Sequence, residues 1–143
     1  MILSKEQEFS DAQTVTATAA STNLIDLGAT GTVVGGAAAL VRDIGKGEKI
    51  PIVVEVTAAS GTSPTLDVAV QMDTTSAFSS ATTVQTAAQV TAAGRVALWV
   101  LPEQITERYL RLNYTVGGTS PSFTIDSYIP YGDQEGLLGG VGE

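Results

Sequence analysis

The chain has 143 residues, a formal net charge of -8, and neither cysteine nor histidine. The length fits one domain around one hydrophobic core. The missing residue types exclude disulfides, thiolate nucleophiles, Cys/His zinc sites and histidine general bases, and the acidic balance argues against binding to a nucleic acid backbone.

Short alternating segments between turn residues predict an all-β protein with eight or nine strands, starting near the N-terminus. The first strand pair is expected over residues 13–18 and 22–27, closed by Gly28. Residues 28–39 are rich in glycine and alanine and carry no charge, so we expect a loop or flap there. Residues 39–44 follow as a candidate edge strand.

The later strands are expected over residues 50–56, 65–72, 82–90, 95–101, 108–116 and 122–129. Pro51 lacks an amide donor and should lie at the start of its strand, Pro102 should end another, and Gly117-Gly118 should form a turn. Four segments alternate as half-buried strands do. The residues expected to face inward are Leu66, Val68, Val70, Met72, Val96, Leu98, Val100, Leu110, Leu112, Tyr114, Val116, Phe123, Ile125, Ser127 and Ile129. Trp99 and Leu101 should lie on the opposite face from Val96, Leu98 and Val100, and no internal repeat is apparent beyond the strand rhythm.

The chain divides into an expected N-terminal arm (1–12), a β-sandwich (13–130) and a glycine-rich C-terminal tail (131–143). Apolar side chains at the two ends lie on segments too short or too glycine-rich to bury them, so we expect them to contact another protein. These candidate interface residues are Ile2, Leu3, Phe9, Tyr131, Leu137, Leu138 and Val141. No apolar run approaches the roughly 18 residues of a membrane helix, and no signal peptide opens the chain. We therefore expect a soluble protein made in the cytoplasm.

Several residue groups resemble sites of chemistry, but each has a simpler structural explanation. Gly45-Lys46-Gly47 lacks the remaining features of a phosphate loop and is expected to be a β-turn. Asp67 with Asp73, or Asp126 with Asp133, are candidate paired carboxylates or calcium ligands. Alternating Asp on a strand usually marks the solvated face instead. We predict no catalytic residue, metal site or cofactor.

The remaining candidates are equally weak as signals of chemistry. Asn113-Tyr-Thr115 matches a glycosylation tripeptide that has no meaning without secretion, and Ser4-Lys5 lack an accompanying oxyanion turn. Aromatic side chains could stack on sugars, although a core or a subunit interface is their commoner place. The aromatic residues concerned are Trp99, Tyr109, Tyr128 and Tyr131.

Four segments in order resemble the capsid cement family first described in a Bordetella phage. They are residues 1–28, Arg42–Glu48, Gln71–Thr83 and Glu107–Val116. The resemblance implies a jelly-roll-like β-sandwich that binds the outer face of a tailed-phage capsid and locks neighbouring major capsid protein subunits together, with no reaction. It also implies a homo-oligomer, for which a dimer is favoured over a trimer. Residues 28–39 and the tail after Pro130 depart from the family pattern.

The alternative is a carbohydrate- or receptor-binding β-sandwich module of the virion, because fold class alone does not settle function. A binding module would be present in a few copies and carry an aromatic cleft, whereas a cement protein would be present in hundreds. An enzyme would require a concave site with titratable groups, for which the sequence offers no nucleus. The acidic charge favours the outside of a capsid over contact with packaged DNA.

Overall fold

The computed structural model describes residues 4–42 and 46–130. Its strands are β1 (Glu8–Val15), β2 (Ala19–Ala20), β3 (Ile25–Asp26), β4 (Ile50–Asp73), β5 (Thr82–Thr86), β6 (Gly94–Val100) and β7 (Tyr109–Tyr128). Two 3-10 helices, η1 (Lys5–Gln7) and η2 (Pro102–Gln104), complete the regular structure of the described ranges. All strand pairs are antiparallel, which confirms the predicted all-β antiparallel class. Within these ranges, no helix has the length and apolar character needed to cross a membrane.

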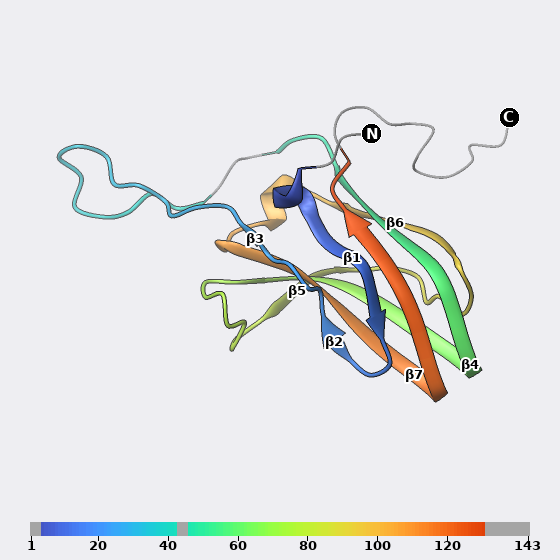
Figure 1. Ribbon diagram of the computed structural model, residues 1–143. Coiled ribbons are helices and arrows are strands. Elements are labelled where there is room, and N and C mark those ends of the chain that lie inside the picture. The colour runs from blue at the N-terminus through green and yellow to red at the C-terminus, as the bar shows by residue number, and fades with distance from the viewer. Residues whose placement is uncertain (1–3, 43–45, 131–143) are drawn as a thin grey trace, which may run out of the picture.

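Strands β4 and β7 form the centre of the sheet (Figure 1). They pair along nearly their whole length, from Val53 opposite Tyr128 to Asp73 opposite Tyr109. Strands β6 and β5 pair with the two ends of β4, while β1, β2 and β3 pair with the other side of β7. Hydrogen bonds therefore join all seven strands in one open sheet.

Each central strand replaces two strands that we predicted separately. The segments 50–56 and 65–72 both belong to β4, and the segments 108–116 and 122–129 fall in or at the end of β7. The structure consequently has fewer strands than the predicted eight or nine. The predicted turn at Gly117-Gly118 is wrong, because β7 continues through these residues while it bends.

The bend occurs at the same short sequence in both strands, Gly61-Thr-Ser-Pro64 in β4 and Gly118-Thr-Ser-Pro121 in β7. Thr62 pairs with Thr119, and the register shifts on both sides of this pair. In each copy the glycine and the serine have positive φ, 118° and 49° in β4 and 106° and 48° in β7. Such irregularities let paired strands turn a corner together. The sequence thus contains a short repeat, contrary to our expectation.

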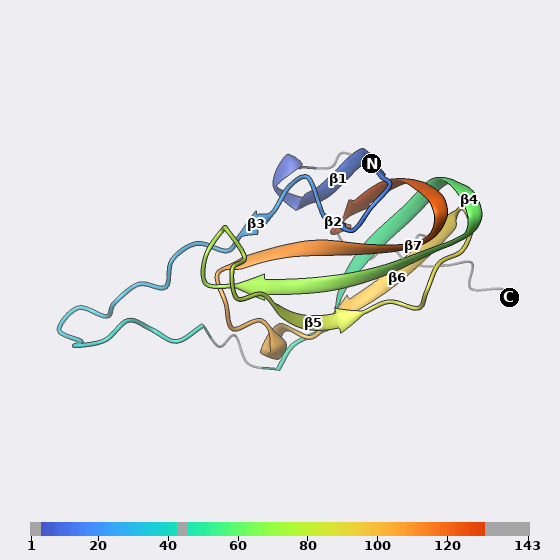
Figure 2. The ribbon, with the colours of Figure 1, turned by 90° about the horizontal axis from the view of Figure 1, so that it is seen from below.

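Because β4 and β7 bend together, the sheet doubles over and its two halves enclose one core (Figure 2). Fully buried core side chains come from both halves of β4 and β7 and from β1 and β6. The largest of them are Tyr114, Phe9, Phe123, Leu66, Leu98, Leu112 and Ile125. The two packed layers are halves of one open sheet rather than two separate sheets, so the jelly-roll sandwich stays a prediction.

The predicted inward faces are confirmed. The inward positions are buried except for Met72, Val96, Val116 and Ile129, which are partly buried and pack against the core. Trp99 faces the other way and is 42% exposed. Pro102 ends β6 as predicted, and Pro51 lies at the start of β4.

Three predicted segments differ at their boundaries. Strand β1 begins at Glu8, inside the segment assigned to the N-terminal arm, because Phe9 is an apolar core residue. The described part of the candidate edge strand 39–44 forms no strand, and Ala39 makes only an isolated bridge to Thr32. Strand β5 ends at Thr86, after which the chain makes a separate bridge from Val90 to Leu66.

A buried hydroxyl cluster links the two layers across the core. The Tyr114 hydroxyl lies 2.8 Å from Ser10 Oγ and 2.8 Å from Ser127 Oγ. Ser10 also donates to Gln13 Oε1 at 2.7 Å. Burial raises the pKa of Tyr114, while the bonds to Ser10 and Ser127 lower it. The tyrosine hydroxyl is protonated at neutral pH in any case, so it can donate within the cluster.

The Tyr114→Phe variant is expected to have a free energy of unfolding lower by about 1–3 kcal/mol, because the buried Ser127 hydroxyl would lose its hydrogen-bond partner. Urea denaturation followed by circular dichroism measures the difference. The Tyr114→Phe/Ser127→Ala double variant serves as the control and should cost less than the sum of its single changes. An additive result would contradict the proposed coupling.

Candidate interface

The feature that distinguishes this molecule is a segment that projects from the sheet. We call residues 28–41 the arm; it follows β3 and extends away from the body (Figure 1). The bridge between Thr32 and Ala39 and the bond from Leu40 N to Gly31 O (2.8 Å) hold its two sides together. This position confirms the prediction of a loop or flap over residues 28–39.

The tip of the arm is a tight turn over residues 33–36. Gly36 N donates to Val33 O at 2.7 Å, and Gly35 has a φ of +83°. Positive φ at the third residue is the requirement of a type II turn, which glycine meets without steric cost. The second residue of the turn is Val34, and its side chain is fully exposed.

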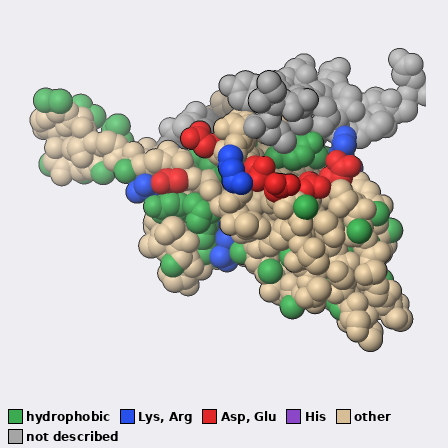
Figure 3. All heavy atoms as spheres, in the orientation of Figure 1, with side chains coloured by type: hydrophobic (Ala, Val, Ile, Leu, Met, Phe, Trp, Pro, Cys, Tyr) green, Lys and Arg blue, Asp and Glu red, His purple; other side chains and the backbone are tan. Residues whose placement is uncertain are grey.

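The arm is uncharged along its whole length and mostly apolar. Its exposed large side chains are Val33, Val34, Leu40 and Val41. No Asp, Glu, Lys or Arg occurs in residues 28–41, although the chain contains 22 charged residues, 15 acidic and 7 basic. Figure 3 shows hydrophobic side chains along the arm and charged side chains where it joins the body. Clustered exposed apolar side chains of this kind mark interaction surfaces.

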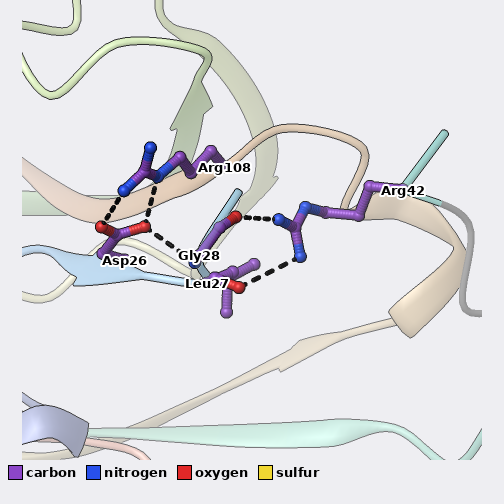
Figure 4. A network of polar contacts seen from close by, with 5 residues as sticks. All are labelled: Asp26, Leu27, Gly28, Arg42 and Arg108. Atoms are coloured by element: carbon purple, nitrogen blue, oxygen red, sulfur yellow. Dashed lines mark hydrogen bonds and ion pairs between the residues drawn. The ribbon is translucent and has the colours of Figure 1, made fainter. Parts of the chain in front are cut away.

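Polar contacts fix the base of the arm to β3 and to the start of β7 (Figure 4). The Arg108 guanidinium donates to both carboxylate oxygens of Asp26, each at 2.6 Å, and Gly28 N donates to Asp26 Oδ1 at 2.8 Å. From the returning side, Arg42 donates to the carbonyl oxygens of Leu27 and Gly28. A bidentate ion pair and this second arginine thus set the direction in which the arm leaves the body.

The ion pair also shifts the pKa values of both of its members, Asp26 and Arg108. The bond from Arg108, followed by that from Gly28 N, lowers the pKa of Asp26 from 3.8 to about 2, and Asp26 in turn raises the pKa of Arg108. Since the pKa of Asp26 is depressed in the folded state, its ionised carboxylate contributes to the free energy of unfolding above about pH 4. This contribution is lost as the pH falls toward 2.

The Arg108→Gln variant is expected to return the pKa of Asp26 toward 3.8, because the largest cause of its lowering is removed. Titration of the Asp26 carboxyl carbon by NMR measures this. Arg42→Gln is the matched control and should move the pKa less, since Arg42 acts only through its more distant charge. Equal shifts in the two variants would show that Arg108 has no special role.

A hollow of about 380 Å³ lies beside the base of the arm. Residues from both sides of the arm base line it, together with Thr74 after β4 and the segment 106–108 before β7. Arg42, Glu107 and Arg108 contribute charged groups to its wall. The hollow therefore combines apolar side chains of the arm, Leu40 and Val41 among them, with these charged groups.

The predicted end anchors are not part of this arrangement. Phe9 is completely buried and is a core residue rather than an exposed contact. The other predicted interface residues lie outside the described residues, namely Ile2, Leu3, Tyr131, Leu137, Leu138 and Val141. Residues 28–39 of the arm were predicted as a loop or flap, and residues 40–41 as part of the edge strand 39–44. The signal that could have revealed a role for the arm is Val33-Val34 between glycines in an uncharged segment.

The described carboxylates of the candidate pairs each accept hydrogen bonds from different parts of the chain. Asp67 accepts hydrogen bonds from Gln89, while Asp73 holds the following loop through the backbone N–H groups of Thr75 and Ser80. Asp126 accepts from Ala12 N at 2.6 Å, and Asp133 is not among the described residues. No group of three or more potential metal ligands occurs in ranges 4–42 and 46–130. Each described carboxylate here therefore has a structural role.

The aromatic candidates are dispersed over different environments. Tyr128 is buried and Tyr109 is partly buried beside Arg108, whose guanidinium lies 4.9 Å from the ring centre. Trp99 is exposed on the outer face of β6, and Tyr131 lies outside the described residues.

The fold defines the class: an all-β protein with one open antiparallel sheet, from which an uncharged arm projects. The sequence model of the Bbp16 family matches residues 9–128. This range contains the whole arm and every strand, apart from the first residue of β1. The chain belongs to this family, a Bordetella phage protein family, which confirms the resemblance. The family places the chain among phage structural proteins. No curated protein sequence matches it.

Proposed function

We propose that the protein is a capsid cement protein, which binds the outer face of a tailed-phage capsid and stabilises contacts between major capsid protein subunits. Membership of the Bbp16 family supports a structural role in a phage. The observation that carries the proposal is the projecting arm with its exposed apolar side chains. A cement protein must bury surface against coat subunits, and an arm extends contact beyond the edge of the body.

The charge of the chain is consistent with the outer side of the shell. At a net charge of -8, contact with packaged DNA would add repulsion between like charges, which the outside of the capsid does not impose. The protein would be synthesised in the host cytoplasm and then added to the shell. It would act without catalysis and without binding nucleic acid or membrane.

Stabilisation follows from binding that depends on the assembled lattice. A ligand that contacts two neighbouring coat subunits binds only when both are in place, so it lowers the free energy of the closed shell alone. Each contact can be of ordinary size, roughly 1,600 Å² or less, because the shell repeats it many times. A homo-oligomer, with a dimer favoured over a trimer, belongs to this proposal. So does a jelly-roll sandwich, for which the two-layered packing of the sheet is the available support.

The alternative, a sugar- or receptor-binding module, has one observation in its favour, the exposed ring of Trp99. Burial of Tyr128 removes a second stacking surface from the set of aromatic residues considered.

Particles that lack the protein should release DNA at lower temperature than complete particles, whereas coat assembly should proceed in both. A heating series followed by a DNA-binding dye measures release, and gel densitometry of complete particles should give hundreds of copies. Adding back purified protein should restore the higher release temperature. Equal release with and without the protein, at a few copies per particle, would favour the binding-module alternative.

A further inference from the structure

The strands at the margins of the sheet differ in how far they are protected from further pairing. Strand β1 changes register twice along β7, Ala12 within it has a φ of 46°, and its Phe9 O accepts a hydrogen bond from Asn23 N. Strands β2 and β3 have two residues each, and β5 has a register shift against β4. Bulges and short length are devices that keep an edge from pairing with another chain.

Strand β6 has none of these devices. Its seven residues pair with residues 50–56 of β4 in one unbroken register. On its other side it pairs with no strand within ranges 4–42 and 46–130. It contains no proline, and Arg95 is its one charged residue. A regular edge of this kind can take up a further strand through the backbone groups on that side.

The sequence of β6 suits the strand to pairing with a second copy of itself. Its middle residue is Ala97, so two copies placed antiparallel about Ala97 pair along the whole strand. In this register Arg95 of each copy lies opposite Trp99 of the other, and Val96 lies opposite Leu98. Because side chains alternate, Arg95, Ala97 and Trp99 share the outer face, with the smallest of the three on the two-fold axis. The edge is thus self-complementary, as a two-fold interface requires.

The pair of Arg95 and Trp99 is what favours a second copy over an unrelated strand. Tryptophan is the best ring for a cation–π contact with a guanidinium, and the two-fold axis supplies this contact twice. Glu55 Oε2 lies 3.0 Å from Arg95 Nη2, so the guanidinium keeps its counter-charge when a ring covers it. Trp99 is 42% exposed in the single chain and would be covered in the pair. No like charges of the two strands face each other in this register.

We infer that β6 is the dimer interface, where two copies join edge to edge about Ala97 and their sheets become continuous. The inference rests on the homo-oligomer that belongs to the proposed function. It gives that oligomer a place in the fold and a register, and it does not depend on where the dimer binds the shell.

The chain has no cysteine, so single cysteines report this register directly. Ala97→Cys places two thiols opposite each other and should give a covalent dimer with the thiol oxidant diamide, because paired Cα atoms lie about 4.5–5.5 Å apart, within disulfide range. Arg95→Cys alone and Trp99→Cys alone should stay uncoupled, because an offset of four residues separates their thiols by about 13 Å. An equimolar mixture of these two variants should cross-link.

Sedimentation of the full-length protein measures the strength of association. Trp99→Lys places a like charge opposite Arg95 twice per dimer and should raise the dissociation constant roughly tenfold or more. Trp99→Glu removes the same ring but places a carboxylate opposite Arg95, so it should raise the dissociation constant less. Thr91→Lys adds its charge to the exposed loop between β5 and β6 and should associate as the unaltered protein does. Because Trp99 and Thr91 are exposed, circular dichroism should show all three variants folded.

The outcomes separate the interface from the proposed function. A dimer that Ala97→Cys does not cross-link, or equal effects of Trp99→Lys and Trp99→Glu, would overturn the β6 interface and leave the homo-oligomer standing. A strictly monomeric unaltered protein would also overturn it, and loss of shell binding by Trp99→Lys would then identify a coat strand as the partner of β6. If a dimer cross-linked through Ala97→Cys failed to raise the DNA release temperature of particles, the cementing function would fall while the interface stood.

Discussion

Replacing Gly118 with alanine is expected to lower the free energy of unfolding by about 3 kcal/mol or more, through backbone strain combined with steric overlap. Gly118 has a φ of +106°, a region that side-chain-bearing residues rarely adopt. A Cβ there would lie 2.6 Å from Ser63 O and 3.0 Å from Pro64 Cα, both backbone atoms of the neighbouring strand. Neither atom can move without opening the corner at which the sheet doubles over.

Gly61 and Gly118 each lie against the backbone of the other strand at this corner, so Gly61→Ala should lower the free energy of unfolding by a similar amount. A Cβ on Gly61 would lie 2.8 Å from Ser120 O and 2.9 Å from Pro121 Cα. The double variant should cost less than the sum of the two, because either change already separates the same pair of strands.

Gly35→Ala provides the matched control for the corner variants. Gly35 also has a positive φ, +83°, but a Cβ there would meet nothing within 4 Å. Its replacement should therefore cost only the backbone strain, on the order of 1 kcal/mol. Urea denaturation monitored by circular dichroism compares the variants. Equal costs at Gly118 and Gly35 would show that close packing at the corner contributes nothing.

The Phe123→Ala variant is expected to lose about 3–5 kcal/mol of stability, the usual cost of removing a buried phenylalanine ring from a packed core. Phe123 is completely buried in β7, where it pairs with Val15 of β1 and Ala59 of β4. Its ring lies in the core that the two halves of the sheet share. The loss would approach the whole stability of an ordinary domain.

Trp99→Ala is the contrast for this second experiment. Trp99 is also a large aromatic residue on a regular strand, but it faces solvent and is 42% exposed. Its removal should cost clearly less than the removal of Phe123. Trp99 is the only tryptophan of the chain, so its replacement removes the tryptophan fluorescence signal. Circular dichroism should therefore monitor unfolding of both variants. A larger loss at Trp99 would contradict the assignment of the buried face.

The candidate interface was only partly predictable. Residues 28–39 could be recognised as a loop, because glycine and alanine dominate and no alternation occurs. Whether Val33 and Val34 are covered depends on what the rest of the chain places over them, which residue type does not reveal. The same limit applied to Phe9, which was expected to contact another protein but is buried within its own sheet.

The sequence by itself determined the antiparallel all-β class and the buried face of the four alternating segments, because side chains alternate with a period of two and apolar side chains leave water wherever the chain pairs. Leu112 inside and Trp99 outside follow from this local rule. The tertiary structure alone decided that four predicted strands are two. Continuity through Gly61 and Gly118 depends on a close approach between backbones far apart in sequence. It likewise decided the direction of the arm, because the bond between Asp26 and Arg108 joins residues 82 positions apart and forms only once β3 lies beside β7.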